Sequence, residues 1–204
     1  MAASRAITFA GPEGQLEGVL HLPDSAPVAI AVVAHPLPTM GGTMDNKIVT
    51  TLSKTFAELG FATLRFNFRG VGASAGMFDN GEGEVDDVLS AVQHVQDAFG
   101  ELPLILAGFS FGGYVQARAA EHLHPHKLVL IAPAVGRFAM PHVAPDTLVI
   151  HGEQDEMIPL AEALDWARPQ QLPVLVLPEA GHFFHGRLHQ IRQIVLKEFN
   201  GCGL

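Results

Sequence analysis

The chain has very little cysteine, few basic residues and no long apolar segment. Its 204 residues include one cysteine, Cys202, so a disulfide cannot form within the chain. Twelve lysines and arginines stand against 21 acidic residues, and the resulting net charge of −9 would repel nucleic acid and anionic membranes. No apolar run reaches the roughly 18 residues that a transmembrane helix requires. We therefore expect a protein that has neither nucleic acid nor a membrane as a partner.

Apolar sequence, by contrast, is abundant. Hydrophobic residues make up 48% of the chain and charged residues 16%, a balance that excludes intrinsic disorder. The length suits one domain and no linker or repeat interrupts it, so we expect a single domain over residues 1–204. The first residues lack the basic segment and apolar core of a secretory signal, which predicts a cytoplasmic protein. The composition favours neither a monomer nor a homodimer.

Uniformly apolar runs alternate with segments of helical periodicity. Such runs are typical of parallel strands covered on both faces, and they occupy residues 28–34, 62–66, 104–107, 127–131, 148–150 and 174–177. The spacing of apolar residues predicts helices over residues 48–59, 85–99 and 188–199, and the segment over residues 111–122 is a fourth candidate. Residues 6–9 and 16–22, separated by glycine and proline, predict an antiparallel hairpin. The sequence thus predicts an α/β fold, with a mostly parallel doubly wound sheet that begins with an antiparallel hairpin.

A Gly-x-Ser-x-Gly motif lies between a predicted strand and a predicted helix. In so tight a turn the central residue is strained, and the small residues Gly108 and Gly112 relieve the crowding around Ser110. The Ser110 hydroxyl would project at a helix N-terminus, where free amides favour the negative charge that forms when serine attacks an acyl carbon. We therefore predict that Ser110 is a nucleophile rather than an ordinary helix cap.

A serine hydroxyl becomes a good nucleophile when a histidine, held by an acid, takes its proton. Asp155 and His182 follow Ser110 in that order, each in a loop after a predicted strand, where open parallel sheets bind their ligands. The alternative acids are Glu153 and Glu156. The alternative base is His185, but the position of His182 directly after a glycine in the strand-end loop favours His182.

Several segments, in order along the chain, match those of one protein family. They are residues 35–38 with 41–42, residues 65–74, residues 108–112, residues 151–155 and residues 181–184. Through them nearly the whole chain resembles the α/β-hydrolases, and in particular the small lidless serine hydrolases related to dienelactone hydrolase. The resemblance implies Ser110 as nucleophile, His182 as general base and acid, and Asp155 as the residue that orients His182.

The chain departs from that family at two positions. Dienelactone hydrolases carry cysteine where Ser110 stands, so their particular substrate does not carry over. Many relatives carry aspartate where Asn67 stands, and we interpret the missing charge as structural. Arg69, near Asn67, follows a strand end and is either a ligand for a substrate carboxylate or a partner of local carboxylates; the second interpretation is favoured.

Two backbone amides are needed to hold the oxyanion of an acyl-transfer reaction. The residue after the nucleophile, Phe111, supplies one. The loop after residues 28–34 should supply the other, and Leu37 is the candidate because its neighbours Pro36 and Pro38 have no N–H. This position agrees with the family resemblance.

The segment between residues 131 and 147 is short, whereas lidded relatives insert extra residues there. We therefore expect an open cleft. The residues expected to form its apolar substrate-binding surface, beside the predicted oxyanion-hole residues, are Met40, Phe109, Phe183 and Phe184. Such a lining favours short or medium acyl groups over long lipid chains.

These features predict a carboxylesterase-type serine hydrolase that cleaves a small-molecule ester through an acyl-enzyme and needs no cofactor. A thioesterase or a lactonase would use the same residues. A peptidase is less favoured because no added segment would hold a peptide, and a binding protein without turnover is a further alternative. His122, His124 and His126 alternate in a way that can bind metal, but Pro125 interrupts them and the serine mechanism requires no metal, so no metal site is predicted.

Overall fold

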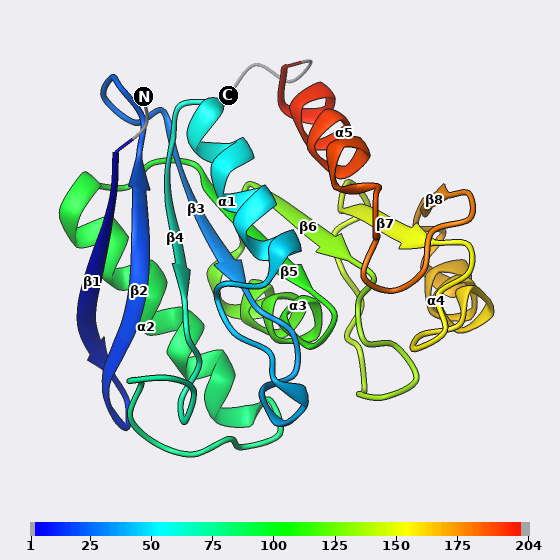
Figure 1. The fold of residues 1–204 in the computed structure, drawn as a ribbon, viewed down its shortest axis with the longest axis horizontal. Helices are drawn as coiled ribbons and strands as arrows, with labels where there is room; N and C mark the ends of the chain where they lie inside the picture. Colours follow the sequence, from blue (N-terminus) through cyan, green and yellow to red (C-terminus); the bar gives the residue numbers. More distant parts are fainter. Residues whose placement is uncertain (1–2, 201–204) are drawn as a thin grey trace.

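The computed structural model describes residues 3–200 (Figure 1). Cys202 lies outside the described residues. One sheet of eight strands runs through the described part of the chain, in the order β1-β2-β4-β3-β5-β6-β7-β8. The strands are β1 (Ala3–Gly11), β2 (Gly14–Leu22), β3 (Ala29–Ala34), β4 (Phe61–Phe66), β5 (Leu104–Phe109), β6 (Lys127–Ile131), β7 (Leu148–Gly152) and β8 (Leu175–Leu177). The helices are α1 (Lys47–Glu58), α2 (Glu82–Phe99), α3 (Phe111–Leu123), α4 (Leu160–Ala167) and α5 (Leu188–Asn200), with short 3-10 helices at Pro38–Met40 and Arg168–Gln170.

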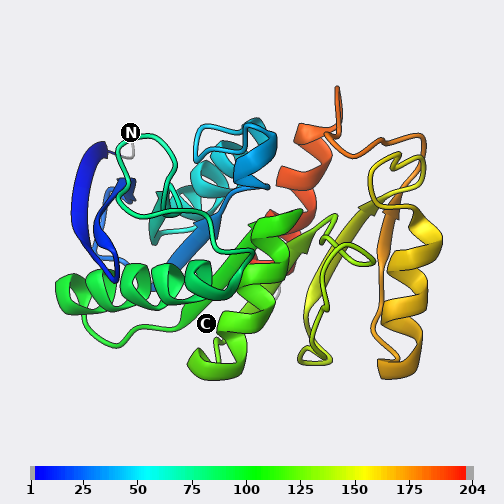
Figure 2. The ribbon, with the colours of Figure 1, turned by 90° about the horizontal axis from the view of Figure 1, so that it is seen from below.

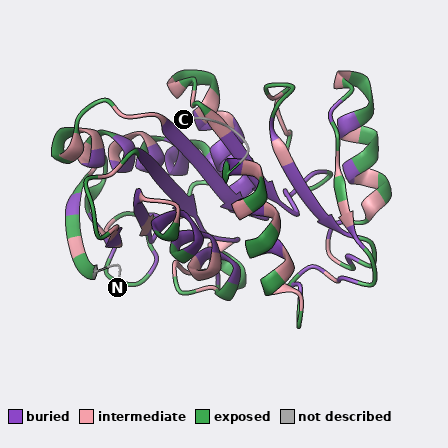
Figure 3. Cartoon of the chain, turned by 90° about the horizontal axis from the view of Figure 1, so that it is seen from above, coloured by how far each residue is buried: buried purple, intermediate pink, exposed green. Residues whose placement is uncertain are grey.

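The predicted fold class is confirmed. The hairpin β1–β2 and the pair β2–β4 are antiparallel, and the remaining strand pairs, from β4–β3 to β7–β8, are parallel. All six residues of β3 and all six of β5 are buried, as expected for strands covered on both faces. Figure 3 shows these central strands in the colour of buried residues, with exposed residues on the outer faces of the helices.

Helices cover both faces of the sheet (Figure 2). Apolar residues of α1 and α5 pack on one face, and those of α2 and α3 pack on the other. Helix α1 begins at a capping residue, Asn46, whose side chain accepts a hydrogen bond from the Ile48 amide at 2.9 Å. In the described part of the chain, no helix combines the length and the apolarity needed to cross a bilayer.

Helix α4 was not predicted from the periodicity of apolar residues. Its fully buried residues are Ala163 and Ala167, and Trp166 is partly buried against the same clusters. Two alanines one turn apart give too weak an apolar stripe to be recognised in the sequence. The helix matters for the site because it follows the loop that carries Asp155.

Candidate active site

The candidate site lies where the parallel strands end. Each strand from β3 to β8, apart from β4, is followed by a segment that contributes to it. In chain order these contributions are Leu37 after β3, Ser110 after β5, residues 134–138 after β6, Asp155 after β7 and His182 after β8. Parallel strands that end at one edge therefore bring together residues that lie more than 140 positions apart in the chain.

Ser110 occupies the sharp turn from β5 to α3. Its φ of 53° and ψ of −117° place a non-glycine residue in a strained conformation. A Cβ atom at Gly108 would lie 2.3 Å from the Gly112 carbonyl oxygen, and a Cβ at Gly112 would lie 2.4 Å from the Ala34 carbonyl oxygen. Only glycine fits at either position, so the motif has the steric role that the sequence predicts for it.

Ser110, His182 and Asp155 form a continuous hydrogen-bonded chain. His182 Nε2 lies 3.1 Å from Ser110 Oγ, and His182 Nδ1 lies 2.8 Å from Asp155 Oδ2. With the Nδ1 proton directed to Asp155, Nε2 is free to accept the proton of the Ser110 hydroxyl. Two of the alternative residues do not join this chain of hydrogen bonds: Glu153 accepts a hydrogen bond from the Glu179 amide, and His185 is exposed.

Asp155 is buried and yet held as a carboxylate. Its Oδ1 accepts hydrogen bonds from the amides of Met157 at 2.9 Å and Ile158 at 2.7 Å, and Oδ2 faces His182. Burial by itself raises the pKa of Asp155, but the hydrogen bonds from His182 and the Ile158 amide outweigh it, so the pKa lies below its usual value. The ionised carboxylate therefore remains available to orient His182.

His151 is a buried neighbour of Asp155 with a structural role. Its Nε2 lies 2.8 Å from the carbonyl oxygen of Ile158 and 3.6 Å from Asp155 Oδ2. Burial lowers the pKa of His151, partly opposed by the bond to Ile158 and by the charge of Asp155, so the ring is neutral at neutral pH. His151 thus supports the loop that carries the acid.

The loop after β3 brings Leu37 to the pocket that contains Ser110. Phe111 lines the same pocket, so both residues predicted to donate to the oxyanion lie beside the serine. The Leu37 carbonyl accepts hydrogen bonds from the amides of Met40 at 3.1 Å and Gly42 at 3.0 Å, so the loop is closed on itself. A Cβ at Gly42 would lie 2.0 Å from the Pro36 carbonyl oxygen, which explains the glycine there.

His35 anchors the same loop to the end of β4. Its Nε2 accepts a hydrogen bond from the Phe68 amide at 3.1 Å, so the ring proton is on Nδ1, which donates to the Pro36 carbonyl at 2.7 Å. Burial lowers the pKa of His35 to about 4, against a smaller opposing effect of the bond to Pro36. A neutral, doubly hydrogen-bonded imidazole therefore holds the segment before Leu37 in place.

Asn67 and Arg69 both have structural partners. Asn67 accepts a hydrogen bond from the Met44 amide at 2.8 Å and donates one to Glu17 Oε1 at 2.7 Å. Arg69 forms a buried ion pair with Asp87 of α2, with Nη2 and Oδ1 2.9 Å apart. The favoured interpretation of Arg69 as a partner of a local carboxylate is confirmed, and Arg69 is not positioned as a ligand for substrate.

The pocket at Ser110 has a volume of about 210 Å³. Its lining consists of Leu37, Met40, Ser110, Phe111, Ala134, Arg137, Phe138, Met157, Ile158 and His182. Of the four side chains expected to bind substrate, Met40 is in this lining. The expectation was wrong for Phe109 and Phe184, which are fully buried in the core cluster on the α1–α5 face of the sheet.

Phe183 is also absent from the pocket lining and instead packs beside the histidine. Its ring lies 5.2 Å from the His182 ring, and the Phe109 ring lies 5.0 Å from His182 on the core side. The Phe109 and Phe183 rings also contact each other, with their centroids 6.2 Å apart, so they pack on neighbouring sides of the imidazole. Their effect on a substrate is therefore indirect.

Sequence analysis missed the wall of the pocket formed by residues 134–138 and 157–158. The Arg137 guanidinium donates a hydrogen bond through Nη2 to the Met157 carbonyl at 2.9 Å and so joins the two segments. Glu156, considered above as an alternative acid, accepts a hydrogen bond from the His182 amide at 3.2 Å. The signal that could have found Arg137 is its place just after the end of a predicted parallel strand.

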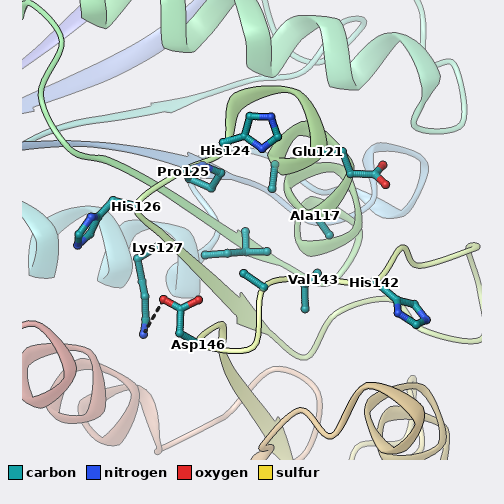
Figure 4. Close-up of a pocket in the computed structure, with 12 residues that line it drawn as sticks. Ala117, Glu121, His124, Pro125, His126, Lys127, His142, Val143 and Asp146 are labelled. Carbon is teal, nitrogen blue, oxygen red and sulfur yellow. Dashed lines mark ion pairs between the residues drawn. The ribbon is translucent and has the colours of Figure 1, made fainter.

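Two of the alternating histidines, His124 and His126, line a different pocket, of about 320 Å³, at the opposite end of β6 (Figure 4). His126 and His142 lie on opposite sides of this pocket, and Lys127 pairs with Asp146 at 3.8 Å. Among residues 3–200 no group of three metal-binding side chains is close enough to hold an ion. Neither this pocket nor the site at Ser110 provides a ligand set for a metal.

Comparison with known proteins places this architecture in a family. The family model "Serine aminopeptidase, S33" matches residues 40–144. The crystal structure of XC6422 from Xanthomonas campestris, an α/β serine hydrolase without a lid, is 40% identical with a TM-score of 0.92, over 97% of this chain and 94% of that one. An α/β serine hydrolase homologue from Coxiella burnetii is 39% identical with a TM-score of 0.88, over 95% of this chain and 96% of that one.

The chain belongs to the α/β-hydrolase superfamily, as a serine hydrolase without a lid domain. The uncharacterized protein RP471 of Rickettsia prowazekii (strain Madrid E) is 39% identical over 147 residues, which are 71% of this chain and 57% of that protein. The chain thus spans little more than half the length of that curated relative. The narrower resemblance to dienelactone hydrolases stays a prediction.

Proposed function

We propose that this protein hydrolyses small carboxylic esters with short to medium acyl groups through an acyl-enzyme. The observation that carries the proposal is the hydrogen-bonded chain from Asp155 through His182 to Ser110, beside a pocket that Leu37 and Phe111 help to line. This arrangement supplies an activated nucleophile and oxyanion donors at one point.

In the proposed reaction Ser110 Oγ bonds to the ester carbonyl carbon while His182 Nε2 takes the hydroxyl proton. The amides of Leu37 and Phe111 hold the carbonyl oxygen as it becomes negative. The bond between the carbonyl carbon and the alcohol oxygen then breaks, and His182 gives its proton to the oxygen of the leaving alcohol. Water then attacks the acyl-serine by the same route, releasing the acid and restoring Ser110.

The size and chemistry of the pocket support a small acyl group. A volume of about 210 Å³ is below the roughly 300 Å³ at which pockets for drug-sized ligands begin. Most of the lining is apolar and includes Leu37, Met40, Phe138 and Ile158. A long lipid chain would extend far beyond this surface.

Aminopeptidase activity, which the name of the matching family model suggests, is less well supported. An aminopeptidase recognises the α-ammonium group of its substrate, for which a carboxylate is the natural ligand. The pocket lining at Ser110 contains no aspartate or glutamate and has one arginine, Arg137. A positively charged substrate end would be repelled there. A thioester or a lactone would suit the same residues, and these remain the alternatives to an ester.

Covalent labelling tests the nucleophile without a choice of substrate. We expect a fluorophosphonate to add once to the folded protein, on Ser110, because the reagent reacts with serines that a base and an oxyanion hole activate. Intact mass followed by peptide mapping measures this. The Ser110→Ala variant is the control and should take up no label. Folded wild-type protein that remains unlabelled would favour a binding protein without turnover.

A graded series of para-nitrophenyl esters, from acetyl to palmitoyl, tests the acyl preference. We expect kcat/KM to be highest among the short and medium chains and to fall for the long ones. A maximum with palmitoyl ester would overturn the proposed preference. Matched thioesters and lactones, assayed in parallel, would identify the leaving group that the enzyme favours.

A further inference from the structure

Arg137 is the one permanently charged side chain in the lining of the pocket at Ser110. It lies in the short segment after β6 and is exposed to solvent. Its Nη2 donates to the Met157 carbonyl at 2.9 Å, which holds the guanidinium against the wall formed by the Asp155 loop. An arginine carries five N–H donors, so most of its donors remain available to a ligand.

The pairing of the other arginines makes Arg137 unusual in this protein. Of the eight arginines in the sequence, six lie within 4.0 Å of a carboxylate in the described structure: Arg65, Arg69, Arg118, Arg168, Arg187 and Arg192. No such pair involves Arg137 among residues 3–200, although the chain has 21 acidic residues. Glu162 packs against Gly136, directly before Arg137, and still forms no ion pair with it.

We propose that Arg137 selects esters whose acyl part ends in a carboxylate, such as the half-esters of short dicarboxylic acids. This inference rests on the proposed ester hydrolysis and names its substrate class. The scissile carbonyl would sit at Ser110 between the amides of Leu37 and Phe111. A short methylene spacer would then cross the apolar wall at Phe138, and the distal carboxylate would bind the guanidinium fork.

The chemistry of the Arg137 guanidinium and of a substrate carboxylate fits this assignment. Guanidinium and carboxylate groups form paired, charge-assisted hydrogen bonds that are stronger than bonds between neutral groups. The tether to Met157 restricts the arginine side chain before substrate arrives, so less conformational entropy is lost on binding. The protein as a whole carries a charge of −9, so a local cation is needed for an anionic substrate to bind.

Arg137 also has a structural role, which the experiment must separate from substrate recognition. The Met157 carbonyl that it binds belongs to the residue whose amide donates to Asp155 Oδ1 at 2.9 Å. Loss of Arg137 could therefore disturb the acid loop and slow every substrate. The ratio of two substrates distinguishes the roles, because a disturbed loop lowers both rates alike.

The test compares two para-nitrophenyl esters of equal chain length, the glutarate half-ester and the pentanoate, with enzyme-free rates subtracted. For Arg137→Gln we expect the ratio of kcat/KM for glutaryl over pentanoyl ester to fall about tenfold, mainly through KM. Arg168→Gln is the matched control. It removes the same charge from an exposed ion pair outside the pocket and should keep the wild-type ratio.

Equal losses on both esters in Arg137→Gln would overturn the proposal and assign Arg137 to the loop alone, leaving ester hydrolysis intact. Failure of the wild-type protein to hydrolyse either ester would instead count against the proposed function. If Arg137→Gln does not fold, inhibition of the wild-type enzyme by free carboxylates tests the proposal instead. We expect glutarate to compete with the pentanoyl ester several-fold more strongly than pentanoate does, and equal or weaker inhibition by glutarate would overturn the proposal.

Discussion

At the scale of single residues, the site combines burial with complete hydrogen bonding. Asp155 accepts bonds from two amides and from His182, so a carboxylate that burial would tend to protonate stays charged. The rings of Phe109 and Phe183 both pack against the His182 imidazole. These contacts restrict the conformations of Asp155 and His182. The path of the proton from Ser110 to His182 is therefore set before substrate binds.

Substitution of these residues should separate their roles. We expect Ser110→Ala and His182→Ala each to lower kcat by about 10⁶-fold, and Asp155→Asn by about 10⁴-fold, because the acid orients the base without reacting itself. Steady-state rates on a para-nitrophenyl ester measure this. His185→Ala serves as the control and should stay near the wild-type rate. Substantial turnover by His182→Ala would transfer the role of base to His185.

At the scale of elements, the turn from β5 to α3 depends on close contact between backbones. Gly112 is the second residue of α3 and lies against the Ala34 carbonyl at the end of β3. Helix α3 can therefore begin directly over the end of a neighbouring strand, which places Ser110 beside the loop of Leu37. A larger residue would push the helix away from that loop.

Gly112→Ala should consequently damage both stability and activity. A Cβ there would lie 2.4 Å from a backbone oxygen that cannot rotate away, so we expect a loss of about 2 kcal/mol in the free energy of unfolding and a reduced kcat. Gly113→Ala is the matched control, since its nearest contact would be 3.3 Å and alanine favours a helix. Urea denaturation compares the two variants. A wild-type stability in Gly112→Ala would show that the turn tolerates a methyl group.

At the scale of the whole molecule, the sheet lies between the apolar cores on its two faces. Some polar groups are buried with it, and they make the stability of the fold sensitive to acid. His35 is the clearest case, because its ring is fully buried between the end of β3 and Phe68 of the segment after β4. Its pKa in the folded protein is about 4, against 6.5 for an unperturbed histidine. Between these two values the unfolded chain binds a proton that the folded chain does not.

Stability should therefore decrease as the pH falls from 6.5 toward 4. The neutral His35 contributes its full stabilisation above pH 6.5, and about 3 kcal/mol is lost by pH 4. Denaturation by urea across this range measures the slope. In His35→Asn we expect a shallower slope on a less stable protein, whereas the exposed His189→Asn should keep the wild-type slope. An unchanged slope in His35→Asn would assign the acid sensitivity to other groups.

The features that could be predicted from the sequence were those encoded locally. Apolar runs predicted the central strands, helical spacing predicted α1, α2 and α5, and the segment after Ser110 was a candidate for α3. The glycines around Ser110 predicted the strained turn because a tight strand-to-helix connection requires small residues. Asp155 and His182 followed from the rule that parallel strands end at one edge, and the structure brings both to Ser110.

The direction of individual side chains, and contacts between distant segments, required the tertiary structure. Phe109 and Phe184 are as apolar as a pocket lining should be, but packing against the α1–α5 layer turns them into the core. Arg137 and Met157 lie 20 positions apart and meet only because β6 and β7 are neighbours in the sheet. By itself the sequence determined the strands, the turn and the reactive residues, since those depend on local patterns. Strand pairing and helix packing decided which side chains face the substrate, because neither is encoded in any single segment.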